Sequence, residues 1–515
     1  MMKMVKNAIG REVPLHVENF RTLTPFAGAV VHTPLIKKDK GNRNLPKLSK
    51  IVPTLQDAIS QTGLQDGMTI SFHHGFRNGD YVLNMVLDVI AAMGIKNLTI
   101  APSSLTDAHI PLIKHIQSGV VTKIYTSGMR GKLGEQISQG MMDTPVLFHS
   151  HGGRARALET GDIKIDVAFL GVPSCDIYGN ANGYTGPSAC GSLGYAMCDA
   201  QTANKVVLIT DYLAEYPNIP FSIHQNQVDC IVKVEAIGDP SKISTGAARF
   251  TRNPRDLLIA QNTARVIMNS GYFEDGFSFQ TGSGGASIAT TRFLRDEMLR
   301  RKITASFVLG GISQAVVQLH EEGLVHRMLD VQSFDAEAIR SIGTNRYHQE
   351  IDASYYANPL NKGCAVNKLN VVVLSALEVD LDFNVNVLTG SDGFIRGASG
   401  GHSDTAIGSD LSVIICPLVR GRIASIVERV QTVITPGESV DVIVTDYGVA
   451  INPRRQELVS SLKKCGLPLY SIEALQQKAQ NIVGVPQPLE FTDKIVGLVE
   501  YRDGTIIDVI HQIKA

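Results

Sequence analysis

Three short sequence segments in the first half of this chain recur in the same order in the second half. This repeat constrains the fold more than any other feature of the sequence. Ser71-Phe-His-His-Gly75 aligns with Ser278-Phe-Gln-Thr-Gly282 at an offset of 207 residues (278 − 71). Asp176-Ile-Tyr-Gly-Asn-Ala-Asn182 aligns with Asp380-Leu-Asp-Phe-Asn-Val-Asn386 at an offset of 204 (380 − 176), and each is followed by a Thr-Gly pair. A third match has an offset of 204 (323 − 119). Three anchors in the same order at a nearly constant offset predict two homologous domains in tandem.

Strands alternate with helices within the repeat. In the first half we expect strands at 67–72, 97–101, 120–125, 165–171 and 205–209, and helices at 55–63, 81–93 and 110–116. This alternation predicts an α/β fold in which each domain has a mostly parallel central sheet with flanking helices. Right-handed crossovers bring the functional loops to the carboxyl ends of the strands. Loops from both domains then meet at an interdomain cleft, where we expect the active site.

Breaks in the periodicity set the expected domain limits. Residues 1–50 are polar and irregular, which predicts an N-terminal arm packed on the body or on a partner, or alternatively a mobile leader. Gly238-Asp-Pro240 interrupts the pattern at the end of the first repeat. We therefore expect a first domain at 51–240 and a second domain at 241–515.

The composition argues against several classes of protein. A net charge of −1 provides no field to attract nucleic acid or an acidic membrane, and no apolar run is long enough for a spanning helix. The N-terminus shows no secretion signal. The seven scattered cysteines lack CxxC spacing and are typical of reduced thiols. These features predict a cytoplasmic enzyme without a metal site.

A glycine-rich segment just past the middle of the chain is the first candidate site. Gly282-Ser-Gly-Gly285 follows the short apolar segment 276–279, and a helical pattern with Ile288, Leu294 and Met298 on its apolar face comes directly after it. The order of strand, glycine loop and helix allows backbone N–H groups to face an anion or a developing oxyanion. A purely structural tight turn is the alternative. The spacing matches neither the dinucleotide-binding motif nor the P-loop motif.

Three further motifs admit a chemical interpretation beside a structural one. His149-x-His151 offers two metal ligands without a third nearby, so anion binding or plain structure is favoured over a metal. Gly397-Ala-Ser-Gly-Gly401 matches the G-x-S-x-G string of serine hydrolases, but residues 401–404 show no helical pattern, which disfavours that interpretation. Glu378 ends the apolar strand 371–379, where its pKa could be shifted for catalysis, although it could equally cap a loop.

Several motifs together carry a family resemblance. Gln280-Thr-Gly-Ser-Gly-Gly285, Ser375-Ala-Leu-Glu-Val-Asp380, Ser399-Gly-Gly-His-Ser-Asp404 and Val444-Thr-Asp-Tyr-Gly-Val-Ala450 occur in the order seen in coenzyme A transferases. From about residue 55 the chain resembles the citrate lyase α subunits within that superfamily, most closely over 169–186 and 388–401. The resemblance implies two tandem domains of the CoA-transferase type.

The resemblance and the motifs define the expected site. We expect the catalytic residues to be Gly282, Ser283, Gly284, Gly285, Gly310, Gly311 and Glu378. We expect substrate or CoA to be bound by His74, Gly75, Arg77, Asn182, Asn386, Gly400, Gly401, His402 and Asp404.

The resemblance also implies a reaction and its participants. Citrate would replace the acetyl group of an acetyl carrier protein, or of acetyl-CoA, to give citryl carrier protein and acetate. No cofactor would be tightly bound, because the acyl thioester is carried by CoA or by a prosthetic group, derived from dephospho-CoA, on a γ subunit. A β subunit would then cleave the citryl thioester. We expect these subunits to form an oligomeric complex.

One departure from the superfamily bears on the mechanism. Glutamate-dependent CoA transferases carry a nucleophilic glutamate near the end of the strand after the glycine loop. The corresponding segment, Ile303–Ile312, ends in Gly310-Gly311 and has no acid. A covalent enzyme thioester therefore lacks its nucleophile, and we expect citrate itself to attack the thioester and form a mixed anhydride. We further expect the two glycines to leave room for citrate.

Other functions remain open at this point. The α subunit of malonate decarboxylase performs the same exchange with malonate, and a non-catalytic scaffold of a lyase complex is a third possibility. The fold family also includes sugar-phosphate isomerases and sensor domains, but these are single-domain or carry a DNA-binding module, and neither pattern is present.

Overall fold

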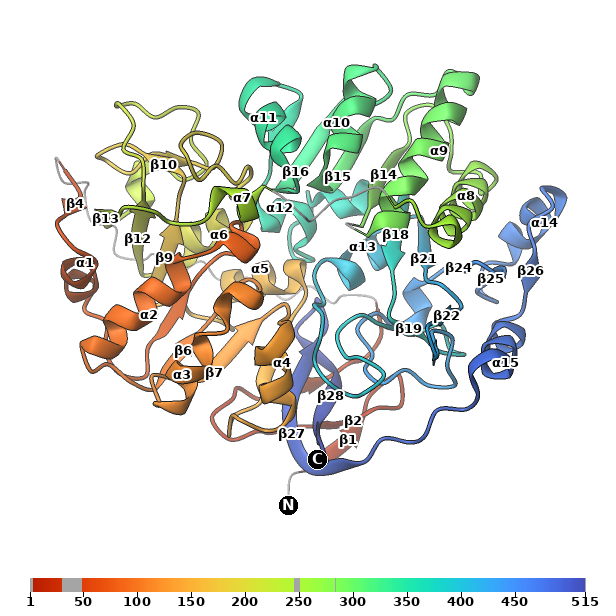
Figure 1. Ribbon diagram of the computed structural model, residues 1–515, viewed down its shortest axis with the longest axis horizontal. Helices are drawn as coiled ribbons and strands as arrows, with labels where there is room; N and C mark the ends of the chain where they lie inside the picture. The colour runs from red at the N-terminus through yellow and green to blue at the C-terminus, as the bar shows by residue number, and fades with distance from the viewer. Residues whose placement is uncertain (1–2, 30–48, 245–250, 283, 515) are drawn as a thin grey trace.

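The computed structural model of the chain describes residues 3–29, 49–244, 251–282 and 284–514. Figure 1 shows two α/β lobes side by side, one from the first half of the chain (red to yellow) and one from the second half (green to blue). Each lobe is built on one large sheet with helices packed against it.

The two sheets are mostly parallel, which confirms the predicted α/β class. In spatial order the first sheet contains β3 (Thr24–Pro25), β28 (Thr505–Ile513), β27 (Phe491–Glu500), β8 (Val146–Phe148), β7 (Val121–Thr126), β6 (Leu98–Ile100), β5 (Thr69–Ser71), β9 (Val167–Gly171), β12 (Lys205–Thr210), β13 (Cys230–Lys233) and β4 (Ile51–Val52). The second contains β17 (His348–Glu350), β16 (Met328–Ser333), β15 (Phe307–Ile312), β14 (Ser278–Thr281), β18 (Val371–Ser375), β21 (Leu411–Ile415), β24 (Val442–Val444), β25 (Val449–Ile451) and β26 (Leu469–Tyr470). The antiparallel neighbours in the described part of these sheets are β27 with β28 and β24 with β25.

The repeat seen in the sequence is also a repeat of topology. The strand order β8-β7-β6-β5-β9-β12-β13 of the first sheet recurs as β17-β16-β15-β14-β18-β21-β24 in the second. A small hairpin follows β9 and β18 in each lobe: β10 (Ser174–Cys175) with β11 (Ala181–Asn182), and β19 (Glu378–Val379) with β20 (Val385–Asn386). The paired ends of the two hairpins have the offset of 204 found in the sequence, since Ser174 pairs with Asn182 and Glu378 with Asn386.

The helices begin and end where the sequence supplies caps. In α1, Thr54 and Asp57 form a capping box and Gly63 ends the helix in the left-handed region, while α8 starts at Pro254 behind the Asn253 cap. The α-helices are α1 (Leu55–Thr62), α2 (Val82–Ala92), α3 (Leu112–Gln117), α4 (Gly131–Ser138), α5 (His151–Thr160), α6 (Gly194–Thr202), α7 (Pro240–Ile243), α8 (Pro254–Met268), α9 (Gly285–Arg301), α10 (Gln314–Glu321), α11 (Ala336–Thr344), α12 (Ala353–Ala357), α13 (His402–Gly408), α14 (Gln456–Lys464) and α15 (Ile472–Val483). The strands and helices expected between residues 55 and 209 are confirmed to within a few residues.

The C-terminal hairpin crosses from the second lobe to the first. β27 pairs in parallel with β8, and β28 pairs with β3 of the N-terminal arm, so the blue hairpin lies beside the orange α4 in Figure 1. Leu498 and Ile506 of the hairpin pack with Val13 and Leu23 of the arm in a separate apolar cluster. The hairpin covers the edge of β8, which would otherwise be open to other strands. The expected division into 51–240 and 241–515 therefore does not follow the two sheets.

The described part of the N-terminal arm packs on the body. Its hairpin of β1 (Met4–Lys6) and β2 (Glu12–Pro14) precedes β3, and the Asn7 side chain donates to the carbonyl of Ile506, 3.2 Å away. Residues 1–2 and 30–48 of the expected arm lie outside the described residues.

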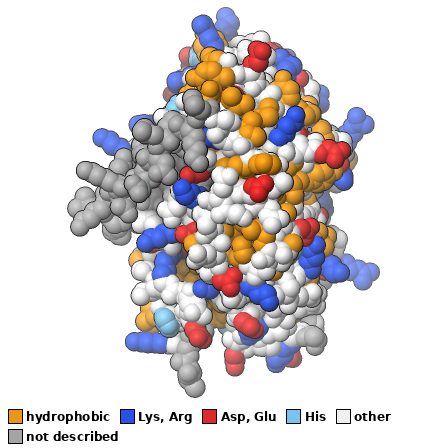
Figure 2. Space-filling view, turned by 90° about the vertical axis from the view of Figure 1, so that its left-hand side faces the viewer, with side chains coloured by type: hydrophobic (Ala, Val, Ile, Leu, Met, Phe, Trp, Pro, Cys, Tyr) orange, Lys and Arg blue, Asp and Glu red, His pale blue; other side chains and the backbone are white. Residues whose placement is uncertain are grey.

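Apolar side chains are exposed on one face of the first lobe. Figure 2 shows this face, on which hydrophobic side chains lie among charged ones. Within the described chain, the loops beyond β10 and β12 hold the exposed side chains of Ile177, Tyr212, Tyr216, Ile219 and Phe221, of which Ile219 is 65% exposed. Exposed apolar groups gathered in this way are typical of surfaces that contact other proteins.

Candidate active site

The glycine loop joins β14 to α9, as the sequence predicts. The amide of Gly282 donates to the carbonyl of Val373, 2.9 Å away, and α9 begins at Gly285 behind an extended Gly284. Among the described residues no side chain caps this helix start. The first N–H groups of a helix have no partner within the helix and carry a partial positive charge. The start of α9 can therefore bind an oxyanion, while Ser283 lies outside the described residues.

Ser375, at the end of β18, packs directly against this loop. A Cβ at Gly284 would lie 2.9 Å from the Ser375 Oγ, closer than a real contact allows. The Ser375 hydroxyl also lies 3.2 Å from that of Ser287 in the first turn of α9. A side chain at position 284 would therefore require the Ser375 hydroxyl to move, and Ser375 is a neighbour that the sequence motifs did not mark as a site residue.

Gly310 and Gly311 do not leave the room that we expected for citrate. Gly310 has a φ of +97°, and a Cβ there would lie 2.8 Å from the carboxamide of Gln280. A side chain at Gly311 would collide with the ring of Phe334. The position of the missing acid is thus filled by Gln280 and Phe334, which corrects the expectation of an open space.

Gln280 connects this position to a second glycine. Its amide Nε2 donates to the Tyr356 hydroxyl, 3.0 Å away, and that hydroxyl lies against Gly401, where it leaves no space for a Cβ. Burial raises the pKa of Tyr356 far above its usual range, so this hydroxyl stays protonated. Gln280 and Tyr356 form a neutral polar pair that connects β14 to the loop before α13.

Arg77 of the first lobe reaches across to the second lobe. It donates to the carbonyls of Phe334, 2.6 Å away, and of Ser333, and its guanidinium lies 5.1 Å from the centre of the Phe334 ring. Its φ is +52°, a conformation that is uncommon outside glycine. Burial lowers the pKa of Arg77 to about 10, which leaves it charged at neutral pH. Much of its hydrogen-bonding capacity is therefore used to join the two lobes.

A group of neutral histidines lies next to Arg77. The rings of His74 and His151 stack with centroids 5.6 Å apart, and Tyr195 lies 4.6 Å and 4.5 Å from them. The His74 Nδ1 lies 2.6 Å from the Ser103 hydroxyl. Burial, assisted by the charge of Arg154, lowers the pKa of His151 to about 3, and burial lowers that of His74 well below its usual range. Both imidazoles are neutral, so they can orient an anionic substrate only as hydrogen-bonding groups.

Gly75 has a local structural reason to be glycine. A Cβ there would lie 2.9 Å from the His73 Nδ1, which accepts the Gly75 amide proton across 3.1 Å.

The loop before α13 closes against the start of α5. The amide of His151 donates to the Gly400 carbonyl, 2.8 Å away. Asp404 accepts hydrogen bonds from the Gly152 amide (2.9 Å) and the Ser150 hydroxyl (2.9 Å), and its Oδ1 lies 3.3 Å from the Arg502 Nε. Three distant parts of the chain therefore meet at one buried carboxylate.

The structure corrects the expectation that no helix follows Gly401. α13 begins at His402, and its residues 402–406 are all buried, so the apolar periodicity of a surface helix is absent. His402 contacts the Thr435 hydroxyl at 2.7 Å and the Ser375 carbonyl at 3.2 Å, whereas Asp404 bonds to Ser150, Gly152 and Arg502. His402 and Asp404 are thus directed to different partners and do not form a catalytic triad.

The two hairpin asparagines are engaged within their own loops. Asn182 accepts from the Thr185 amide (3.1 Å), and Asn386 accepts from the Thr389 amide (3.1 Å). Asn386 also donates to Glu378 across 2.9 Å. Burial raises the pKa of Glu378. The structure therefore places Glu378 beside Asn386 in a hairpin.

The other predicted residues form one contiguous group through shared neighbours. Ser375 joins the glycine loop to His402, Tyr356 joins Gln280 to Gly401, and Gly400 contacts His151, which stacks on His74. In the described ranges no three histidine, cysteine or acidic side chains gather as a set of metal ligands. His151 begins α5, so His149-x-His151 does not lie on a strand. None of the described helices is long and apolar enough to cross a membrane.

The two sheets, the lobe junction and the uncapped glycine helix start define an α/β protein with a candidate anion-binding site between two lobes. The chain matches the family model described as citrate lyase, alpha subunit, over residues 48–513. The citrate lyase alpha chain of Klebsiella pneumoniae is 58% identical over 492 residues, which cover 96% of each chain. The chain belongs to the citrate lyase alpha-subunit family, the transferase component of that enzyme. This confirms the family that the motifs predict.

Solved structures support the fold as well. The structure described as the alpha subunit of citrate lyase in complex with citrate, from Streptococcus mutans, is 55% identical with a TM-score of 0.96, over 99% of this chain and 100% of that one. A malonate decarboxylase alpha subunit from Acinetobacter baumannii is 15% identical with a TM-score of 0.64, over 84% of this chain and 87% of that one. The second likeness concerns the fold only.

Proposed function

We propose that the chain exchanges citrate for the acetyl group of an acetyl thioester, and that no covalent enzyme intermediate is formed. A citrate carboxylate oxygen adds to the thioester carbonyl, the C–S bond of the tetrahedral adduct breaks, and the thiolate leaves to give an acetyl-citrate anhydride. The thiolate then attacks the citryl carbonyl of the anhydride, and the C–O bond to acetate breaks. The products are citryl thioester and acetate, and every atom and charge is accounted for.

One observation carries this proposal. The strand after the glycine loop ends in Gly310-Gly311 without an acid, and Gln280 and Phe334 fill the adjoining space. No residue there supplies a nucleophilic side chain, and a Cβ at Gly310 or Gly311 would meet the side chain of Gln280 or of Phe334. The enzyme therefore acts by holding the two substrates together and by stabilising oxyanions.

The described site residues can be given roles on this basis. The peptide N–H groups at the start of α9, beyond Gly284, stabilise the tetrahedral oxyanions. His74, His402 and the loop of Gly400 and Gly401 orient the substrates at the junction of the lobes. Asp404 holds that junction through Ser150 and Gly152. Arg77 holds it from the other side by bonding to the carbonyl of Phe334.

Glu378, Asn182 and Asn386 have more distant roles in this proposal. Each belongs to a hairpin that extends from the carboxyl end of a strand, so they support the walls of the site rather than the reacting atoms. Gly75 allows close packing at His73.

The finer architecture forms part of the same proposal. We assign the lobes to two homologous domains of the CoA-transferase type, with the active site between them. The matching strand order supports this assignment. The first domain then comprises 51–240 together with the hairpin 491–513, and the second comprises 241–490.

The participants follow from the reaction. The thioester is borne by CoA or by a dephospho-CoA-derived group on a γ subunit, and a β subunit cleaves the product, all in a cytoplasmic oligomeric complex. The citrate named with the Streptococcus mutans relative supports citrate as the acid. The exposed apolar residues around Tyr216 and Ile219 support contacts with other subunits.

A thioester-exchange assay tests the reaction. The purified chain is mixed with acetyl-CoA and either citrate or malonate, and acetate and the new thioester are measured. We expect turnover with citrate. Turnover with malonate instead would favour the malonate decarboxylase reaction, and no turnover with either acid or with acetyl carrier protein would favour a scaffold.

Chemical trapping tests the anhydride route. The enzyme is incubated with acetyl-CoA and then treated with borohydride, and its peptides are examined by mass spectrometry. We expect no modified glutamate. A glutamate whose side chain has been reduced by borohydride, anywhere in the chain, would contradict the anhydride route.

A further inference from the structure

A pocket of about 530 Å³ lies on the outer side of the second lobe, between helices α9 and α10. Figure 1 shows the two helices next to each other, above β14 and β15. Its lining comes from three segments: Thr251, Arg252 and Leu257 before and within α8, Ala289, Thr291, Arg292, Arg295 and Asp296 of α9, and Ala315, Gln318, Leu319 and Glu322 along α10 and just beyond it. Its volume is in the range of small-molecule sites.

The pocket begins close to both glycine motifs. Ala289 is four residues beyond Gly285, which corresponds to about 6 Å along a helix at 1.5 Å per residue. Ala315 is four residues beyond Gly311, and lies in the first turn of α10. The pocket therefore lies within reach of a long substrate whose reactive end is at the start of α9.

The arginines that line the pocket differ in whether they are paired with an acidic side chain. Arg295 is neutralised by Glu322, 2.6 Å away, and by Asp296, 3.2 Å away. Arg252 and Arg292 are exposed, and within the described ranges neither forms a hydrogen bond or an ion pair. Arg292 lies seven residues beyond Gly285, or about 10 Å along α9. Two guanidinium groups thus remain available to a ligand in the pocket.

Guanidinium groups bind phosphate oxygens in a bidentate manner. The remaining wall includes the apolar side chains of Leu257, Ala289, Ala315 and Leu319, which suit an aliphatic linker. Free cationic groups, an apolar wall and a nearby helix start for the reactive carbonyl match a ligand that carries a phosphate, a linker and a thioester.

We propose that the α9–α10 groove binds the diphosphate end of the pantetheine thioester, with Arg252 and Arg292 as its phosphate ligands. This rests on the proposed function, which supplies the thioester. The diphosphate is shared by free CoA and by the dephospho-CoA-derived group of a carrier protein. The groove therefore serves either donor.

Calorimetry with CoA, 3′-dephospho-CoA and pantetheine tests the assignment. We compare the wild-type chain with Arg252→Gln, Arg292→Gln and the double variant. Arg300→Gln is the matched control, because Arg300 lies on α9 outside the groove and pairs with Glu297. We expect each groove substitution to weaken CoA and dephospho-CoA about tenfold, the size of one charge-assisted contact, and to leave pantetheine unchanged. The control should bind all three ligands as the wild type does.

Kinetics provide an independent readout. The double variant should raise KM for acetyl-CoA with kcat unchanged, and should process S-acetylpantetheine as the wild type does. Equal losses with both thioesters would indicate a structural defect and overturn the assignment. Unchanged CoA binding would also overturn it, as would an effect on CoA but not on dephospho-CoA, which would assign the arginines to the 3′-phosphate.

The two proposals can fail separately, because calorimetry requires no turnover. If the wild type exchanges citrate while the arginine variants bind CoA normally, the groove assignment is wrong and the function stands. If CoA binding depends on the arginines but no acid is exchanged, the function is wrong.

Discussion

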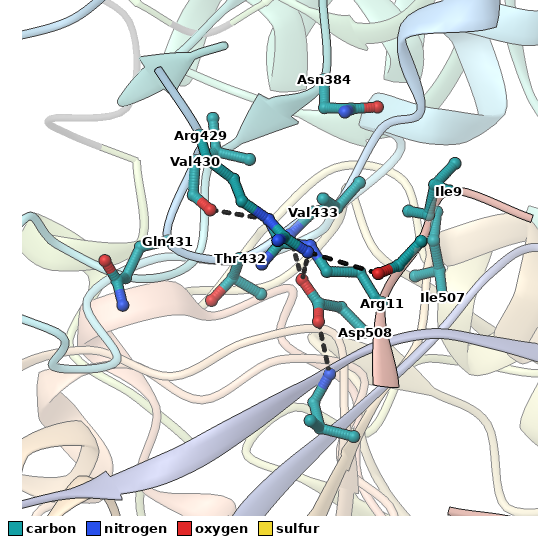
Figure 3. Close-up of polar contacts among 12 residues, drawn as sticks. Ile9, Arg11, Asn384, Arg429, Val430, Gln431, Thr432, Val433, Ile507 and Asp508 are labelled. Carbon is teal, nitrogen blue, oxygen red and sulfur yellow. Dashed lines mark hydrogen bonds and ion pairs between the residues drawn. The ribbon is translucent and has the colours of Figure 1, made fainter. Parts of the chain in front are cut away.

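Arg11 of the N-terminal arm and Asp508 of the C-terminal hairpin form an ion pair, with the Nε 3.4 Å from the Oδ2, and both side chains are largely buried (14% and 4% exposed). Figure 3 shows this pair beneath the loop 429–433 of the second lobe. Arg11 also donates to the Val430 carbonyl, 2.7 Å away, and Asp508 accepts from the Val433 amide, 2.8 Å away. The arm, the hairpin and the second lobe are thus joined at one point.

Arg11→Met should destabilise the protein by about 3 kcal/mol at pH 7, because it leaves the Asp508 carboxylate buried without its cation. Burial already raises the pKa of Asp508, and Arg11 opposes that shift. Without Arg11 the folded-state pKa rises further above the unfolded value, so the stability of the variant decreases as the pH rises through it. Urea denaturation at pH 5 and pH 7 should show the larger deficit at pH 7.

Asp508→Asn in the same background is the control for that effect. The double variant Arg11→Met/Asp508→Asn should lose the difference between the two pH values. A deficit in Arg11→Met that is equal at both values would show that the carboxylate is not its cause.

Gly311→Ala should destabilise the enzyme by about 1–3 kcal/mol, since the added methyl group meets the Phe334 ring. Its exchange rate should decrease as well, because Phe334 lies between Gly311 and Arg77 at the junction of the lobes. The free energy of unfolding from urea curves and the citrate-dependent release of acetate measure the two effects.

Phe334→Leu provides the rescue. The double variant Gly311→Ala/Phe334→Leu should be more stable than the sum of the single changes predicts. Strict additivity would mean that the ring is not what excludes a side chain at position 311.

Asp404→Asn should destabilise the protein by about 3 kcal/mol, because Arg502 is left buried without a counter-charge. Ser150 and Gly152, which precede and begin the helix next to His74, would lose a charged acceptor. A double-mutant cycle with Arg502→Gln should give a coupling energy of about 1–3 kcal/mol. Independent effects of the two substitutions would contradict the assignment of Asp404 as the partner of Arg502.

Because His402 is buried and neutral, we expect the stability of the protein to decrease as the pH falls. Burial lowers the pKa of His402 to about 4, so it is neutral in the folded chain and bonds to Thr435 and Ser375. Between pH 6.5 and pH 4 the unfolded chain binds a proton that the folded chain does not, and stability therefore decreases as the pH falls, by at most about 1.4 kcal/mol per unit.

His402→Gln should remove that contribution. Its free energy of unfolding, measured at steps from pH 7 to pH 5, should decrease less steeply than that of the wild type. His326→Gln, at an exposed position, is the control for loss of an imidazole. Parallel curves for the wild type and His402→Gln would rule out His402 as a source of the slope.

Much of the fold follows from patterns within short stretches. The two Gly-containing anchors near residues 75 and 282 predict equivalent strands, and the sheets have the same strand order around β5 and β14. The glycine loop was predicted because the strand, the loop and the helix that define it are adjacent in the chain.

Other features depend on contacts that local patterns do not encode. The sequence of β27 does not specify that this strand pairs with β8, some 350 residues earlier. α13 was missed because buried helices lack a polar face, so its sequence has no periodicity. Gln280, Phe334, Tyr356 and Ser375 contact the site residues through tertiary packing, and only Gln280 and Ser375 lay within motifs that we had noted.

The crossing of the C-terminal hairpin has a consequence for biosynthesis. β27 and β28 lie some 350 residues after β8 in the chain, so strand β8 has no partner on one edge until translation has passed the hairpin. During that time the nascent first lobe presents an open strand edge of the kind that recruits other chains. Residues 491–513 therefore complete the first sheet, and a product that stops before them keeps this open edge and is prone to aggregation.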